Sequence, residues 1–203
     1  ERNPAGRDGL ANPNRRVARP QSGRWRYRFS PRRPGRAVIE LQAGRLDILP
    51  SMLRTPEREK MAYFSRPHNR SPNVLFIRTQ VASQYRLKSL AEIIGTPFKL
   101  GAQIGVAYGP EYNHLATRAD FQERITAITS RRSAWKMMEL QRIDGIISDE
   151  VSALVELQQL GLSNAVVRSD VVVSEEPARF ALAKASHAPD FVARFDKALG
   201  GLM

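Results

Sequence analysis

The chain has 203 residues, 42% of them hydrophobic, which suits one large domain or two small ones with a core of ordinary size. It contains no cysteine and only three scattered histidines, so we expect neither disulfides nor a metal site. No apolar run reaches about 18 residues, the length that a transmembrane helix needs. No signal peptide and no cofactor-binding motif is visible, and no cofactor is expected.

The net charge of +12 is concentrated in residues 1–36, which carry eleven Arg, no Lys and two acids. Proline and glycine interrupt this segment, and it shows no helical period. Three interpretations are open: a basic arm that stacks on bases and contacts phosphates, a solvated disordered arm, or a leader translated from an altered reading frame. The all-Arg composition and the abrupt change near residue 37 favour the third, and we expect no nucleic-acid binding.

From residue 37 onward, apolar patterns of helical and strand type alternate along the chain. We expect the first strand to end at Pro50. The alternation indicates α/β architecture with mostly parallel sheets. Helices are predicted at residues 37–43, 56–61, 89–95, 110–117, 133–141, 150–160 and 189–199, and strands at residues 46–49, 74–78, 99–106, 125–129, 143–147, 166–167, 171–173 and 180–183.

The segment around Arg58 is the first candidate for a binding site. Thr55 is a predicted helix N-cap, and Pro56 suits the first helical position. Arg58 beside a helix N-terminus at the end of a strand is able to hold a carboxylate or another anion. On local features alone, a surface Arg paired with a nearby acid is the better interpretation. Helix openings at Thr55, Gly109 and Asp149 are expected to converge on one crevice, since ligands of open α/β sheets bind beyond the strand ends.

A longer pattern carries a family resemblance. The stretch "LQAGRLDILPSMLRTPEREKMAYFSRPH" is similar to the central motif of family 3 extracellular solute-binding proteins, the polar amino-acid receptors of bacterial ABC importers. Three later segments resemble later parts of that family in the same order: "SLAEIIGTPFKLGAQIGVAYGPEYNHL", "LQRIDGIISDEVSALV" and "ARFALAKAS". The resemblance covers residues 37–203. The matching positions of the central motif are Leu41, Gly44, Asp47, Thr55, Arg58, Phe64, Ser65 and Pro67, with His68 in place of a Tyr.

This resemblance implies a type II periplasmic-binding-protein fold of α/β class, with two lobes and a two-strand hinge. Residues 37–75 and 171–203 would form the first lobe and residues 76–170 the second. The first lobe is expected to be incomplete, because nothing in residues 1–36 resembles the family's first strand and helix, and the chain would then be a fragment. The implied function is that of a periplasmic, monomeric substrate-binding component, which binds a small polar solute between the lobes and docks on an inner-membrane permease.

The resemblance also implies ligand contacts. Arg58 would grip the ligand α-carboxylate, a bidentate pairing suited to a water-poor cleft. Asp149 would take the α-ammonium, although by itself it is most simply a helix N-cap. Ser51 matches a polar residue of the first-lobe ligand loop, and an ordinary loop hydroxyl is the alternative.

The second-lobe loop departs from the family pattern. Gly109 and Glu111 stand at positions where family members contact the ligand, with Pro110 between them. Pro110 has no N–H to donate, and Glu111 would repel a carboxylate if it faced the cleft. An amino-acid zwitterion is the expected ligand, and a cationic, amine-bearing or otherwise non-standard ligand remains open.

Two other functions compete with transport. The same fold serves in receptor domains and in cyclohexadienyl-dehydratase-like enzymes, and Glu111 or Glu150 would be the acid that such an enzyme requires. No nucleophile–His–acid set and no Gly-rich phosphate loop is present, so we expect no catalytic residue and no enzyme. Nucleic-acid binding through the Arg-rich segment is the remaining alternative.

Overall fold

The computed structural model describes residues 34–201. The three interpretations of the Arg-rich segment concern residues 1–36, and residues 1–33 of it lie outside the described residues.

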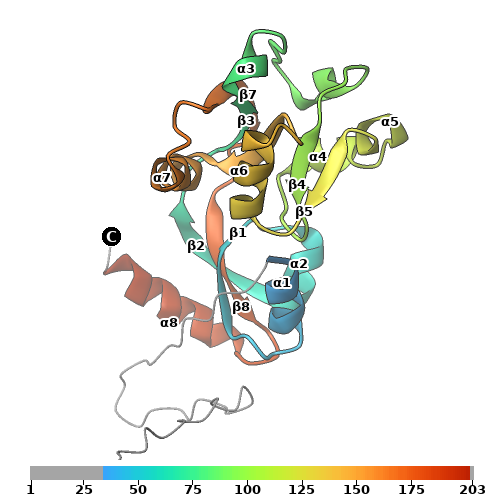
Figure 1. The fold of residues 1–203 in the computed structure, drawn as a ribbon. Helices are drawn as coiled ribbons and strands as arrows, with labels where there is room; N and C mark the ends of the chain where they lie inside the picture. Colours follow the sequence, from blue (N-terminus) through green and yellow to red (C-terminus); the bar gives the residue numbers. More distant parts are fainter. Residues whose placement is uncertain (1–33, 202–203) are drawn as a thin grey trace, which may run out of the picture. The chain divides into compact units, whose positions relative to one another are not determined.

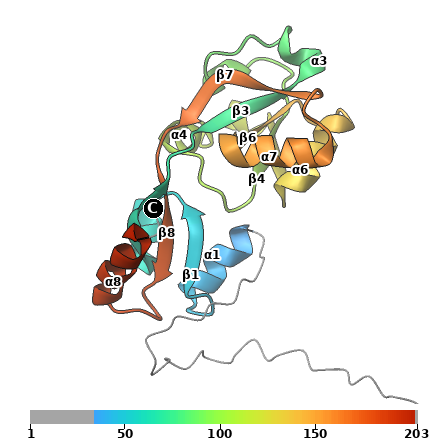
Figure 2. The ribbon, with the colours of Figure 1, turned by 90° about the vertical axis from the view of Figure 1, so that its left-hand side faces the viewer.

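The strands form two sheets (Figure 1). One has three strands in the order β1-β8-β2, and the other has five in the order β5-β4-β6-β3-β7. In Figure 2, β3 and β7 lie side by side, and each continues into a segment that leads to the three-stranded sheet. The strands are β1 (Ile48–Met52), β2 (Ala62–Asn69), β3 (Asn73–Arg78), β4 (Leu100–Gln103), β5 (Ile125–Ile128), β6 (Gly145–Asp149), β7 (Val166–Ser174) and β8 (Ala178–Ala183).

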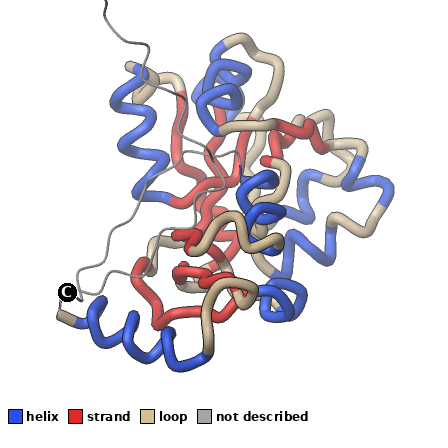
Figure 3. The backbone as a smooth tube through the Cα atoms, turned by 90° about the horizontal axis from the view of Figure 1, so that it is seen from below, coloured by secondary structure: helices blue, strands red, loops and turns tan. Residues whose placement is uncertain are grey.

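Helices flank the strands, as the tube in Figure 3 shows. Most are short, and η1 is a 3-10 helix. The helices are α1 (Pro34–Gln42), α2 (Pro56–Met61), α3 (Thr79–Ala82), η1 (Leu90–Ile93), α4 (Pro110–Leu115), α5 (Ala119–Gln122), α6 (Arg131–Glu139), α7 (Glu150–Leu160) and α8 (Pro189–Gly200).

The prediction of mostly parallel sheets is wrong. Only β4 pairs in parallel fashion, with β5 and with β6. Both pairings of the three-stranded sheet are antiparallel, and so are the pairings of β3 with β6 and with β7. The physical reason is connectivity. Helices link β4, β5 and β6, whereas β3 and β7 are the strands by which the chain enters and leaves the five-stranded sheet.

Two strands of the three-stranded sheet contain proline, and the sequence analysis predicted neither of them correctly. β1 continues through Pro50 to Met52, because β1 pairs only with β8 among the described residues and an edge strand tolerates a missing N–H. β2, which contains Pro67, was not predicted at all, and its register with β8 shifts on both sides of Pro67.

Two helix starts also differ from the prediction. Helix 89–95 is the 3-10 helix η1, and the Ser89 side chain caps nothing; Glu92 instead accepts a hydrogen bond from the Lys88 N–H at 2.9 Å. α6 begins at Arg131 rather than at Ser133, because the Ser130 hydroxyl is the N-cap and accepts from the Ser133 N–H.

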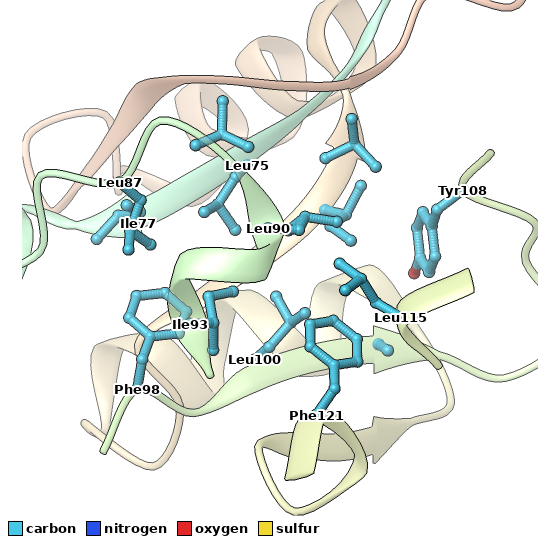
Figure 4. Packing of buried hydrophobic residues seen from close by; sticks show 14 residues of the cluster. Leu75, Ile77, Leu87, Leu90, Ile93, Phe98, Leu100, Tyr108, Leu115 and Phe121 are labelled. Atoms are coloured by element: carbon cyan, nitrogen blue, oxygen red, sulfur yellow. The ribbon is translucent and has the colours of Figure 1, made fainter. Parts of the chain in front are cut away.

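The five-stranded sheet is buried on both faces. Along β3, Leu75 and Ile77 belong to one apolar cluster, while Val74 and Phe76 belong to another, as the alternation of a strand requires. Figure 4 shows the first cluster, in which Leu90 packs with β3 and with residues of η1, α4 and α5. Side chains of α6 and α7 build the second cluster. This part of the chain is therefore a three-layer αβα unit.

The three-stranded sheet packs against α1 on one face and α8 on the other. Leu41 of α1 is fully buried with Ala181 and Ala183 of β8. α8 instead places Phe195 5.2 Å from the ring of Phe180, and Asp196 accepts a hydrogen bond from the Arg66 N–H at 2.9 Å. The helix predicted at residues 189–199 is thus confirmed as α8, although none of its residues is fully buried.

Because of the two histidines beside α8, we expect the free energy of unfolding to fall at acidic pH. The His68 ring lies 4.3 Å from Phe180 and the His187 ring stacks 4.1 Å from Phe191. Desolvation lowers both histidine pKa values below the ordinary value of 6.5, and Asp47 partly opposes this at His187. Because the folded state binds protons more weakly than the unfolded state, this contribution is complete above about pH 6.5 and is lost as the pH falls from that value through the lower folded-state pKa.

The measurement is the urea midpoint at pH 7.5 and pH 5.5. The double variant His68→Phe/His187→Phe is expected to lose less stability over this interval than the unchanged chain. His114→Gln, which alters an exposed histidine on α4, is the control and should behave like the unchanged chain. Identical pH dependence of all three proteins would contradict the prediction.

Candidate ligand pocket

A cavity of about 820 Å³ is bounded on one side by elements beside the three-stranded sheet and on the other by elements beside the five-stranded sheet. α1, α2 and the segment after β8 provide one wall, and the segment before α4, together with Asn113 on α4, provides the other. Its lining residues are Val38, Gln42, Thr55, Glu57, Arg58, Lys60, Met61, Gly105, Val106, Ala107, Asn113, Lys184 and Ala185.

Arg58 joins the two walls. Thr55 caps α2 as predicted, with its hydroxyl accepting the Arg58 N–H at 3.3 Å, and Pro56 occupies the first turn. The Arg58 guanidinium donates from Nη1 to the Leu53 carbonyl at 3.0 Å and from Nη2 to the Gly105 carbonyl at 3.1 Å. Burial lowers the Arg58 pKa from its ordinary value, but a guanidinium remains charged in proteins. A fixed cation therefore stands in the cavity wall, with two neutral carbonyls as its partners.

Tyr108 supports the opposite wall, which the segment before α4 forms. This side chain is buried, its hydroxyl accepts the Gln103 N–H at 2.7 Å, and burial raises its pKa. Gly105 has φ +80, and a Cβ there would lie 2.3 Å from the Cα of Gly35 in α1. Only glycine combines that backbone conformation with so close an approach. The segment between Gln103 and Tyr108 is thereby kept against Arg58.

Gly109 and Glu111 do not line this cavity. A Cβ on Gly109, which has φ +115, would lie 2.7 Å from the Cβ of Ser174, so Gly109 packs against the end of β7. The Glu111 carboxylate accepts a hydrogen bond from the Leu90 N–H at 3.3 Å and so belongs to the start of η1.

Asp149 and Ser51 also lie outside the lining. Asp149 ends β6 and accepts the Ser152 N–H at 2.8 Å, which confirms the predicted N-cap of α7. Ser51 is exposed in β1 at φ +55, where the register between β1 and β8 shifts. Of the five residues predicted to bind ligand, only Arg58 lies in this cavity.

Sequence reasoning missed several polar residues of the lining. Lys60 follows Arg58 by two positions in α2, Lys184 directly follows β8, and Asn113 and Gln42 come from helices on opposite walls. Lys184 donates a hydrogen bond to the Glu59 carbonyl and lies 5.1 Å from the Tyr63 ring centroid. The only signal for Lys60 was its nearness to Arg58, and no local pattern marks the other three.

Within residues 34–201, no group of three or more His, Cys, Asp or Glu is arranged to hold a metal ion. Over the same range, no helix combines the length and the apolar character needed to cross a membrane.

The family described as bacterial extracellular solute-binding proteins, family 3, matches residues 17–203. The chain belongs to this family. The match begins upstream of residue 37, where the resemblance described from the sequence begins. As expected for a family 3 solute-binding protein, the fold is the type II periplasmic-binding-protein fold, in which the chain crosses twice between two lobes. No curated protein sequence gives a significant match to the chain.

Several solved structures resemble the chain in fold. An ancestral arginine-binding protein bound to arginine is 23% identical, with a TM-score of 0.70 over 86% of this chain and 74% of that protein. An amino acid ABC transporter substrate-binding protein from Streptococcus pneumoniae, bound to L-arginine, is 20% identical, with a TM-score of 0.64 over 83% and 66%. A histidine kinase sensor domain similar to periplasmic binding proteins is 18% identical, with a TM-score of 0.66 over 81% and 67%.

Proposed function

We propose that this chain is the periplasmic substrate-binding component of an ABC importer. It binds a small polar solute between its lobes as a monomer and presents the closed form to an inner-membrane permease. The observation that carries the proposal is the cavity around Arg58. Elements beside both sheets form its walls, and the Arg58 guanidinium bonds the Gly105 carbonyl on the opposite wall. Membership of the solute-binding family supports it.

We place the two lobes around the two sheets. The boundaries expected from sequence, residues 37–75 with 171–203 and residues 76–170, cut through β3 and β7. Both strands pair with the five-stranded sheet from end to end, and Asn73 pairs with Ser174 where they leave it. We therefore set the crossings at residues 70–72 and 175–177. Ligand would favour the closed arrangement of these lobes, and the permease would read that difference.

Arg58 is the proposed ligand anchor. An incoming acid group would replace the Gly105 carbonyl on Nη2, so that the guanidinium would bond an acceptor of opposite charge in place of a neutral one. For Asp149 and Gly109 we propose support of the hinge, since Asp149 pairs with Asn73 and Gly109 abuts Ser174.

A receptor role is the second candidate, because a sensor domain shares the fold. A dehydratase-like activity has less support, since each candidate acid already has a partner. Glu111 accepts from the Leu90 N–H, and Glu150 pairs with Arg168 at 2.7 Å. We therefore propose a non-catalytic binding protein.

Thermal shift on the full chain tests the anchor. The ligands are amino acids, polyamines and small carboxylates. A ligand at about 100 times its Kd should stabilise the chain by about 2.7 kcal/mol, which corresponds to a few degrees in Tm. Arg58→Ala is expected to abolish the shift, because the ligand loses its charged partner.

Arg54→Ala is the matched control. Arg54 is exposed, pairs with Glu59 and does not line the cavity, so its loss should leave the ligand shift intact. A ligand that stabilises the unchanged chain and Arg58→Ala equally would refute the anchor.

A further inference from the structure

The charges of the cavity point to a narrower ligand class. We propose that it takes a small dianion, a solute with two acid groups such as a dicarboxylate, in preference to a cationic amino acid. This inference rests on the proposed function. Three cationic side chains line the cavity (Arg58, Lys60 and Lys184), against the single acid Glu57.

A cationic ligand would need carboxylates to replace its water. Glu57, the one acid of the lining, stands at the start of α2. Its own backbone N–H and the Thr55 hydroxyl hold the pKa of its carboxyl below the ordinary value, so its charge is already engaged at the helix start. A ligand guanidinium or ammonium would therefore meet repulsion from the lysines without a free acid to compensate.

The site for an α-ammonium is also not part of this cavity. Asp149, the residue expected to take that group, accepts the Ser152 N–H and lies outside the lining. Within residues 34–201, Glu57 is the only acid among the lining residues. The lining thus selects against the positive end of a zwitterion as well as against a cationic side chain.

The cations are arranged to receive two acid groups. Arg58 provides the first contact through the nitrogen that now bonds Gly105. Lys60 and Lys184 provide the second. Lys184 is positioned by the Glu59 carbonyl and the Tyr63 ring, and an ammonium with three donors keeps others for a ligand. The uncharged amides of Gln42 and Asn113 complete the polar lining and fit hydroxyl or carbonyl oxygens between the acid groups.

Arginine-bound proteins are among the similar structures, so the inference makes an opposing statement about this chain. The test measures Kd for the full chain by calorimetry with glutarate, L-glutamate, L-glutamine, L-arginine and putrescine at pH 7.5. Glutarate is expected to bind most tightly, L-glutamate next, and L-arginine and putrescine not measurably. Raising the salt concentration should weaken glutarate binding, since the lysines are solvent-exposed.

The variant Lys60→Glu/Lys184→Glu should weaken glutarate binding by about tenfold or more, because two attractive charges become repulsive. Lys88→Glu/Lys136→Glu makes the same change in net charge at exposed lysines outside the lining and should leave glutarate binding within about twofold, since such charges are screened. The pair of variants separates a local effect from one of overall charge.

The outcomes distinguish the two levels of the argument. Tighter binding of L-arginine or L-glutamine than of glutarate, lost in Arg58→Ala, would overturn the dianion and leave the proposed function standing. Glutarate binding unaffected by Lys60→Glu/Lys184→Glu would also overturn the inference. Binding of none of the five solutes would contradict the proposed function and the inference together.

Discussion

Replacing Asp144 by Ala is expected to lower the free energy of unfolding by about 3–5 kcal/mol, because it leaves a buried Arg78 without its counter-charge. Arg78 at the end of β3 is only 7% exposed. Its Nη2 donates to Asp144 Oδ1 at 2.6 Å and its Nε to the Ile143 carbonyl at 3.1 Å, while the other carboxylate oxygen accepts the Lys99 N–H at 2.8 Å. One carboxylate therefore ties the start of β4 and the approach to β6 to the end of β3.

Urea unfolding measures the loss, and Asp120→Ala is the control. Asp120 pairs with Arg118 at the same 2.6 Å, but both side chains are about half exposed. Removing that pair should cost far less than removing Asp144, because water and salt screen it. The double variant Arg78→Met/Asp144→Leu should recover much of the loss, since no buried charge is left unpaired. Equal losses for Asp144→Ala and Asp120→Ala would contradict the argument.

Local signals in the sequence were sufficient to predict those elements whose hydrogen bonds join residues only a few positions apart. Thr55 and Pro56 specify the start of α2, Asp149 specifies the start of α7, and Gly161 ends α7 in the left-handed conformation. β2 depends instead on β8, which is remote in sequence and tolerates the register shifts around Pro67. Strand direction likewise depends on where the chain crosses between sheets, and the local alternation of apolar residues carries no such information.

In the candidate site, too, some features were predictable from the sequence and others depend on tertiary contacts. The local surroundings of Arg58 made it a candidate, the family motif made it the expected ligand residue, and it lines the cavity. Its contact with Gly105 depends on how two lobes meet, whereas the nearness of Lys184 depends on the pairing of β8 with β2 inside one lobe. Glu111 was placed in the site by its position in a motif, but its carboxylate satisfies the Leu90 N–H. A backbone donor at a helix start competed for that side chain, and the one-dimensional pattern does not show the competitor.

Trp135→Ala is expected to cost about 3–5 kcal/mol, the range for removing a large aromatic side chain from a core. Trp135 is fully buried in α6, and its ring meets Phe76 of β3 edge-on at 5.8 Å. Its Nε1 also donates to Glu156 Oε2 in α7 at 2.8 Å, and Arg131 binds the same carboxylate through Nε and Nη2. The ring thus contributes apolar packing against the sheet and one polar link between two helices.

Trp135→Phe separates these contributions, because it keeps an aromatic ring and removes the donor. Its cost should be about 1–3 kcal/mol, the penalty for leaving a partly buried acceptor short of one bond. Denaturant unfolding of the two variants measures the difference, and equal costs would show that the Nε1–H link, rather than ring burial, dominates. Glutarate Kd provides a second readout. Neither Trp135 nor Glu156 lines the cavity, so both variants should bind as the unchanged chain does wherever they are folded. A weakened Kd would mean that α6 and α7 help to set the cavity wall across the sheet, and stability and binding would then not be separable in this lobe.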